Sequence, residues 1–168
     1  RITAIDWALD PATADEQQQL RRTAAALVAV AGRPGARLYL EPLIDLDRTM
    51  DAGLGLLDRQ CNPRPVCHAV RSLVTVLAGR AAPLRPLIRP APPGLTAAGL
   101  DRSGMQCWLL LPDGEPAALD LRRLVDEASP VRQARLIDLP SATIRAIPEP
   151  AAASLTIVRP ALLLLTLA

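Results

Sequence analysis

Hydrophobic residues follow one spacing before residue 80 and a different spacing after it. In residues 1–80, strand-like runs alternate with helix-like stretches in which apolar positions repeat every three or four residues. In residues 81–168, short apolar runs recur about every 8–12 residues, with turn signals between them. The first pattern is typical of β/α units and the second of an antiparallel β-sandwich. The sequence therefore predicts two domains, an α/β part followed by an all-β part.

The first half reads as two β/α units. Residues 1–43 predict a strand, a helix and a second, parallel strand, with the helix starting at a capping box formed by Thr13 and Glu16 and ending at Gly32. A polar loop then leads to a second helix that starts near Pro65. Two strands and two helices cannot close a barrel by themselves. This half therefore needs missing N-terminal partners, or it has a different fold.

The second half begins with a stretch in which prolines at positions between 83 and 93 exclude a helix. The short strands predicted after it include residues 95–100 and 105–111, and the last one covers residues 161–167. Residues 121–128 are the exception, because their pattern predicts one helical segment.

Composition excludes several functions. All 19 basic residues are Arg, 17 acidic residues balance them, and the aromatic residues are Trp7, Tyr39 and Trp108 alone. We therefore expect no nucleic-acid partner, because neither a basic stripe nor a base-stacking surface is indicated. The apolar run 161–168 is far shorter than the ~20 residues of a membrane helix, so no membrane partner is expected.

Cysteine usage and the start of the chain give weaker expectations. Cys61, Cys67 and Cys107 cannot all pair within one chain; small buried thiols are the favoured interpretation, and a Cys61–Cys67 bridge is the alternative. No spacing suits a metal, and His68 reads as a residue on a helix face. The chain starts at Arg1 without a recognisable leader, which suits a fragment of a longer protein.

A specific motif lies between the second strand and the second helix. It combines D-x-D-R at residues 45–48 with G-L-L-D-R-x-x-N-P-R-P-x-x-H-A at residues 55–69. This combination resembles the closing strand and helix of the (β/α)8 barrel in clan-A glycoside hydrolases, in the branch of the β-xylosidases and α-L-iduronidases. Many members of that clan also carry a C-terminal β-sandwich that ends in a strand, a polar-Pro pair and an apolar strand, similar to residues 156–165. The resemblance implies that residues 1–80 are the last two units of a barrel and residues 81–168 an accessory sandwich.

The resemblance also implies where catalytic groups should lie. The family uses two glutamates, after the fourth and the seventh strand, and the fourth strand lies outside this chain. On the seventh-strand pattern, Thr3 and Trp7 match, and Ala4 stands where the nucleophilic glutamate should be. Asp6 points to the same side of the strand as Ala4, because side chains alternate along a strand. Asp6 is therefore the candidate displaced catalytic carboxylate; the alternatives are a hydrogen-bonding wall residue or a cap of the following loop.

The candidate substrate-binding residues are Trp7, Glu41, Asp45, Asp47 and Arg48. Glu41 lies near the carboxyl end of its strand, where barrel residues face the pocket; the alternative is a structural pair with Arg37 or Arg48. Asp45, Asp47 and Asp51 lack the spacing of a calcium loop, so we favour an Asp47–Arg48 network that fixes the loop. No metal and no cofactor are expected.

The resemblance therefore implies the C-terminal part of a glycoside hydrolase that acts on oligo- or polysaccharides, with a carbohydrate substrate as its partner. Because of Ala4, a catalytically impaired relative that still binds carbohydrate is a close alternative. A structural or interaction module, in which the sandwich serves for docking, is the second alternative.

Overall fold

The computed structural model describes residues 3–8, 15–44, 55–78, 83–125, 130–150 and 153–168. The chain divides into two compact units, Arg1–Gly79 and Arg80–Ala168. The first contains both α-helices and a parallel strand pair, and the second is built from antiparallel strands.

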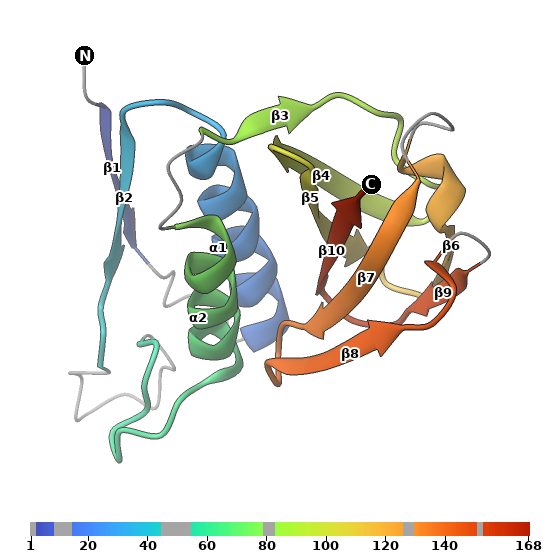
Figure 1. Cartoon of the computed structure of the whole chain (residues 1–168). Coiled ribbons are helices and arrows are strands. Elements are labelled where there is room, and N and C mark those ends of the chain that lie inside the picture. Colours follow the sequence, from blue (N-terminus) through green and yellow to red (C-terminus); the bar gives the residue numbers. More distant parts are fainter. Residues whose placement is uncertain (1–2, 9–14, 45–54, 79–82, 126–129, 151–152) are drawn as a thin grey trace. The chain divides into compact units, whose positions relative to one another are not determined.

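Unit 1 is built on the parallel pair of β1 (Thr3–Ala8) and β2 (Ala36–Glu41). The helix α1 (Glu16–Ala31) connects them, as a parallel pair requires a crossover. The expected strand–helix–strand order is thus confirmed. The helix α2 (Pro65–Leu77) follows after the long loop and starts at the predicted proline. Figure 1 shows α1 and α2 on the same side of the β1–β2 pair.

The start of α1 differs from the capping box predicted at Thr13. Asp15 is the N-cap residue, and its carboxylate accepts a hydrogen bond of 2.8 Å from the backbone N–H of Gln17. Asp, Asn, Ser and Thr are all favoured N-cap residues, so the sequence does not distinguish Thr13 from the neighbouring Asp15 as the cap. Gly32 ends the helix as predicted, and its N–H donates to the carbonyl of Val28.

The two helices pack along their apolar stripes. The fully or nearly fully buried positions of α2 recur with helical spacing, as do those of α1; these residues are Leu20, Ala24, Val28, Val66, Ala69, Leu73 and Leu77. An ion pair of 2.7 Å between Arg64 and Glu16 joins the N-terminal ends of the two helices. Within the described residues, unit 1 therefore shows two β/α steps, and no closed barrel is seen.

Unit 2 contains a six-stranded antiparallel sheet in the order β3-β4-β5-β10-β7-β8 and a two-stranded sheet, β6-β9. The strands are β3 (Arg85–Leu87), β4 (Leu95–Arg102), β5 (Met105–Pro112), β6 (Ala117–Asp120), β7 (Val131–Asp138), β8 (Thr143–Ile147), β9 (Ser154–Ile157) and β10 (Ala161–Leu167). The last strand of the chain order, β10, thus lies in the middle of the large sheet, between β5 and β7.

The core of unit 2 lies between its two sheets, which confirms the predicted β-sandwich. Alternate residues of β4, β5, β10, β7 and β8 point to one face of the large sheet, where β6 and β9 cover them. The buried members of this core are Leu95, Trp108, Leu110, Ala117, Leu119, Leu121, Leu124, Ala134, Ile147, Leu155, Ile157, Ala161, Leu163 and Leu165.

Trp108 is the largest side chain of this core and is 1% exposed. Its ring lies against Gly99, the residue opposite it on β4, and a Cβ added to Gly99 would come within 2.7 Å of the Cζ3 atom of Trp108. The indole N–H donates to the side-chain carbonyl of Gln106 at 3.2 Å. The glycine therefore provides space for the ring, and the glutamine satisfies its polar atom.

One strand of unit 2 was not predicted, and one expected helix was wrong in part. The proline-rich stretch does exclude a helix, but it contains the short edge strand β3, in which Pro86 is tolerated because an edge strand has a free side. The helix expected over residues 121–128 is reduced to one 3-10 turn, Leu121–Arg123; residues 126–129 lie outside the described part. Asp120 caps this turn and pairs with Arg122, so the charged residues that suggested a helix serve a single turn.

Candidate functional site

The parallel pair of unit 1 has one exposed and one half-buried face. The register pairs Ala4 with Arg37 and Asp6 with Tyr39, and these four side chains are exposed. Glu41 continues the same row at the carboxyl end of β2. The alternation of side chains along both strands thus gathers the candidate carboxylates on the face that the helices do not cover.

Asp6 and Glu41 lie on adjacent strands of this exposed face. Both are exposed, and neither forms an ion pair with another residue of the described part of the chain. The structural pair considered for Glu41 with Arg37 is therefore not formed. Tyr39 lies between them in the row and is 48% exposed, so an apolar ring accompanies the two carboxylates.

Trp7 lies on the opposite face of the same strand. It is half-buried, opposite Leu40 of β2 and on the same face as Ile5 and Leu38. The structure thus brings Asp6 and Glu41 together and places Trp7 apart from them. The role of Trp7 in substrate binding stays a prediction.

The remaining candidates, Asp45, Asp47 and Arg48, lie with Asp51 outside the described residues. The described residues on either side of this segment pair with each other just after β2. Ile44 and Leu57 form a parallel bridge, in which the N–H of Leu57 donates to the carbonyl of Leu43 at 2.9 Å.

The second part of the motif forms a closed turn around Asp58. Its carboxylate accepts hydrogen bonds from the backbone N–H groups of Gln60 and Asn62, each at 2.8 Å, and from the Asn62 side-chain amide at 2.9 Å. These bonds, led by the one from the Asn62 side chain, hold the pKa of Asp58 below its ordinary value. Asp58 and Asn62 therefore fix the conformation of the turn that precedes α2.

The three cysteines are free thiols, and the alternative Cys61–Cys67 bridge is not formed. Cys61 is exposed and Cys67 is half-buried, so the expectation of buried thiols is right for Cys107 alone. Burial raises the pKa of Cys107 from 9.0 to about 12. His68 lies half-buried on α2. Within the described ranges, no three His, Cys, Asp or Glu side chains are grouped as a metal site would require.

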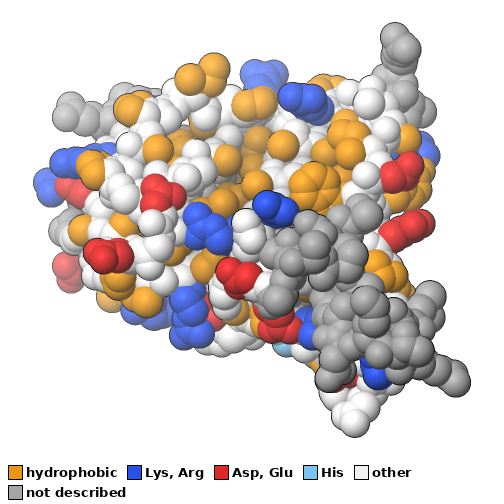
Figure 2. All heavy atoms as spheres, turned by 180° about the vertical axis from the view of Figure 1, so that it is seen from behind, with side chains coloured by type: hydrophobic (Ala, Val, Ile, Leu, Met, Phe, Trp, Pro, Cys, Tyr) orange, Lys and Arg blue, Asp and Glu red, His pale blue; other side chains and the backbone are white. Residues whose placement is uncertain are grey.

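The surface of the described residues carries both signs of charge. On the face shown in Figure 2, Arg and acidic side chains are interspersed, with apolar groups between them. None of the helices in the described part of the chain is both long and apolar enough to span a membrane.

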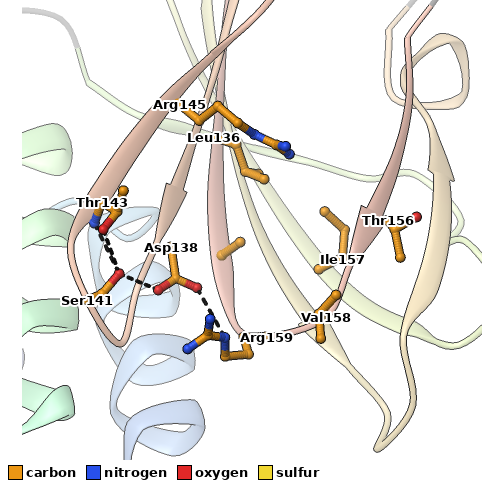
Figure 3. A pocket seen from close by; sticks show the side chains of 10 residues that line it. Leu136, Asp138, Ser141, Thr143, Arg145, Thr156, Ile157, Val158 and Arg159 are labelled. Atoms are coloured by element: carbon orange, nitrogen blue, oxygen red, sulfur yellow. Dashed lines mark hydrogen bonds and ion pairs between the residues drawn. The ribbon is translucent and has the colours of Figure 1, made fainter.

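A pocket that the sequence did not reveal lies in unit 2 and has a volume of about 380 Å³. Its walls come from β7, β8, β9 and the start of β10, and its lining combines charged, hydroxyl and apolar side chains (Figure 3). The lining residues are Leu136, Asp138, Ser141, Thr143, Arg145, Thr156, Ile157, Val158, Arg159 and Ala161. The alternation in β7 and β8 places these side chains on one face, but only the strand pairing, which sequence alone does not give, joins the two rows.

No protein-family model matches this sequence, and neither does any curated protein sequence. Solved structures do share its fold. A GH30 endoxylanase from Clostridium papyrosolvens superposes with a TM-score of 0.57 at 8% identity, over 98% of this chain and 42% of that chain. A variant of AmyP, solved in a complex with maltotriose, superposes with a TM-score of 0.50 at 16% identity, over 94% of this chain and 36% of that chain.

These similarities concern the fold. Both proteins are larger, and this chain spans 42% and 36% of their respective lengths. The fold that this chain shares with them therefore combines β/α units with a β-sandwich. At these identities the similarity does not extend to an activity.

Proposed function

We propose that this chain is the C-terminal part of a glycoside hydrolase-like protein that acts on glycosidic bonds of oligo- or polysaccharides. In this proposal residues 1–80 are the last two β/α units of a (β/α)8 barrel, and residues 81–168 are the accessory sandwich. The observation that carries it is the orientation of the β1–β2 pair: helices lie on one side, and carboxylates with an exposed tyrosine lie on the other. Barrel strands have this polarity, with helices outside and the site at their carboxyl ends.

The proposed chemistry uses two carboxylates. A retaining glycosidase places a nucleophile and an acid/base about 5–5.5 Å apart on either side of the scissile bond. Asp6 is the candidate for the nucleophile, since Ala4, with only a methyl group, cannot attack the anomeric carbon. The acid/base would come from the preceding barrel units, which this chain does not contain.

Carbohydrate as the substrate class is supported by the proteins that share the fold. One is named as an endoxylanase, and the other was solved with maltotriose. In this chain Glu41 is placed to accept hydrogen bonds from sugar hydroxyl groups at the carboxyl end of β2, and Asp45, Asp47 and Arg48 in the following loop are proposed to line the same site. Trp7 completes the proposed set. Its side chain lies on the opposite face of β1 and would support the sugar-binding face from behind.

Ala4 favours a second candidate function, that of a catalytically impaired relative which binds carbohydrate without cleaving it. Asp6 and Glu41 would then serve as hydrogen-bond acceptors for sugar hydroxyls and not as reacting groups. A structural or interaction module remains the alternative from another class, and it predicts neither cleavage nor sugar binding.

The test compares the protein with its upstream barrel units against its Asp6→Asn variant, on xylan, starch and aryl glycosides. We expect cleavage by the parent and a loss of kcat of roughly a thousandfold or more in Asp6→Asn, because an amide cannot act as the nucleophile. Glu115→Gln is the matched control, since Glu115 is an exposed acid in a turn of unit 2.

Three results would contradict parts of this proposal. Cleavage that survives in Asp6→Asn would remove Asp6 from catalysis. Sugar binding without cleavage would establish the impaired relative, and Glu41→Gln should then weaken that binding. The absence of both cleavage and sugar binding would favour the interaction module.

A further inference from the structure

The pocket of unit 2 is built by the register of three neighbouring strands. Arg145 of β8 pairs with Leu136 of β7, and Thr143 pairs with Asp138, which in turn pairs with Ala161 of β10. Because paired residues point to the same face of a sheet, these five side chains form one continuous wall. It lies on the core face of the large sheet, where the pocket remains open to solvent.

The opposing wall comes from the end of β9 and the turn after it. Thr156, Ile157 and Val158 line this side, and Arg159 reaches back toward Asp138 (Figure 3). The turn is fixed because the N–H of Leu139 donates to the carbonyl of Pro160 at 3.0 Å. The cavity therefore has walls held by sheet pairing on one side and by a bonded turn on the other.

The charged side chains at the two ends of the pocket differ in whether they are paired. At one end the Asp138 carboxylate is engaged twice: it accepts a short hydrogen bond from the Ser141 hydroxyl and lies 3.7 Å from the Nε atom of Arg159. At the other end Arg145 makes no hydrogen bond or ion pair with any residue of the described ranges. With two arginines and one aspartate, the lining carries a net charge of +1.

We propose that this pocket binds a sugar unit that carries a carboxylate, such as a uronic acid residue of a polysaccharide. The Arg145 guanidinium would receive the carboxylate in a bidentate pair, for which its planar fork of donors is suited. The apolar surface of Leu136 and Val158 would contact the C–H face of the sugar ring, and the Thr143 hydroxyl would bond its hydroxyl groups. This inference rests on the proposed function for its choice of carbohydrate as the ligand class.

A phosphate or sulfate ligand is less well matched to this geometry. A dianion would meet a lining whose net charge is only +1, because Arg159 is already paired with Asp138. A monoanion with a neutral body uses the single available cation and fills the remaining volume with apolar and hydroxyl contacts.

The experiment is a titration of the ¹⁵N-labelled chain with D-glucuronate, followed by amide chemical shifts. D-glucose is the neutral control, and acetate is the control for a free carboxylate. We expect shifts at Arg145, Thr156 and Val158 with glucuronate, and weaker binding of both controls. Arg145→Gln should weaken glucuronate binding by roughly tenfold or more, the usual effect of losing a charge-assisted hydrogen bond.

Two further variants make the test specific. Arg135→Gln removes an exposed arginine from the opposite face of β7 and should leave the affinity unchanged. Asp138→Asn removes the negative charge of the pocket and releases Arg159, so it should strengthen glucuronate binding. A general loss of structure would not weaken binding in Arg145→Gln and strengthen it in Asp138→Asn.

Equal binding of glucose and glucuronate, or equal weakening by Arg145→Gln and Arg135→Gln, would overturn the inference. The outcome is separate from that of the proposed function. If aryl glycosides are cleaved but glucuronate does not bind here, only the pocket assignment fails. If glucuronate binds here but no glycoside is cleaved, the pocket assignment stands without the hydrolase.

Discussion

At the residue scale, a few side chains have environments that one sequence position cannot reveal. Gly99 is an example, because in the sequence it is one residue of the strand predicted over 95–100 with no indicated role, whereas in the structure it provides space for the Trp108 ring across the sheet. Arg145 is another, since one arginine among 19 becomes notable only when the strand pairing places it in a pocket.

Gly99→Ala should therefore destabilise unit 2 through overpacking. The added methyl group would meet three ring atoms of Trp108 at 2.7–2.8 Å, and the ring is fully enclosed by the core. We expect a loss of about 1–3 kcal/mol in the free energy of unfolding, measured by urea titration and followed by tryptophan fluorescence.

Ala98→Ser is the neighbouring control, because Ala98 is exposed and points to the other face of β4. It should change the stability by less than about 0.5 kcal/mol. If both variants unfold at the same urea concentration as the parent chain, the packing of Trp108 on Gly99 is not as described.

At the scale of the elements, the sequence predicts most strands and both helices because their apolar periodicity is continuous and their ends carry turn residues. The elements that the sequence does not predict depend on contacts with other parts of the fold. The edge strand β3 is hidden by prolines, and the segment after β6 has helical periodicity but forms only the turn Leu121–Arg123. Whether β3 forms depends on its pairing with β4, and after β6 the tertiary context overrides the helical periodicity.

The start of α1 provides a prediction at this scale. Asp15 caps the helix through the N–H of Gln17, and it precedes Glu16, whose ion pair with Arg64 joins α1 to α2. We expect Asp15→Ala to lower the free energy of unfolding by about 1 kcal/mol, because a backbone donor at the helix end loses its acceptor.

Thermal unfolding followed by circular dichroism would measure this effect. Asp15→Asn should retain most of the stability, since an asparagine side chain also accepts the bond. Equal losses for alanine and asparagine would show that charge, and not the capping bond, stabilises this end of the helix.

At the scale of the whole molecule, the candidate site could be predicted only in part. The sequence placed Asp6 and Glu41 on neighbouring strands, and the parallel register puts both on the exposed face. The alternation of side chains along a strand also implies that Trp7 faces away from Asp6. The sequence could not show that a pocket exists in unit 2, because the pocket depends on which strands pair and in which register. The loop with Asp45, Asp47 and Arg48 lies outside the described residues, and its role stays a prediction.

Unit 1 should not be stable when it is expressed by itself. Its described sheet has two parallel strands, and one face, with Ala4 and Tyr39 among its residues, is open to solvent. We expect residues 1–79 alone to show no cooperative thermal transition and to bind the dye ANS, whereas the whole chain unfolds cooperatively. A sharp unfolding transition of the isolated unit would contradict the proposal that barrel units are missing.

The central position of β10 determines when the sandwich can form during synthesis. The β4–β5 hairpin and the β7–β8 hairpin are both complete earlier in the chain, but they meet only through β10. On the ribosome, both hairpins must therefore wait with an unpaired inner edge until residues 161–167 leave the exit tunnel. A chaperone that shields exposed strand edges during this interval would raise the yield of folded protein more than one that acts after release.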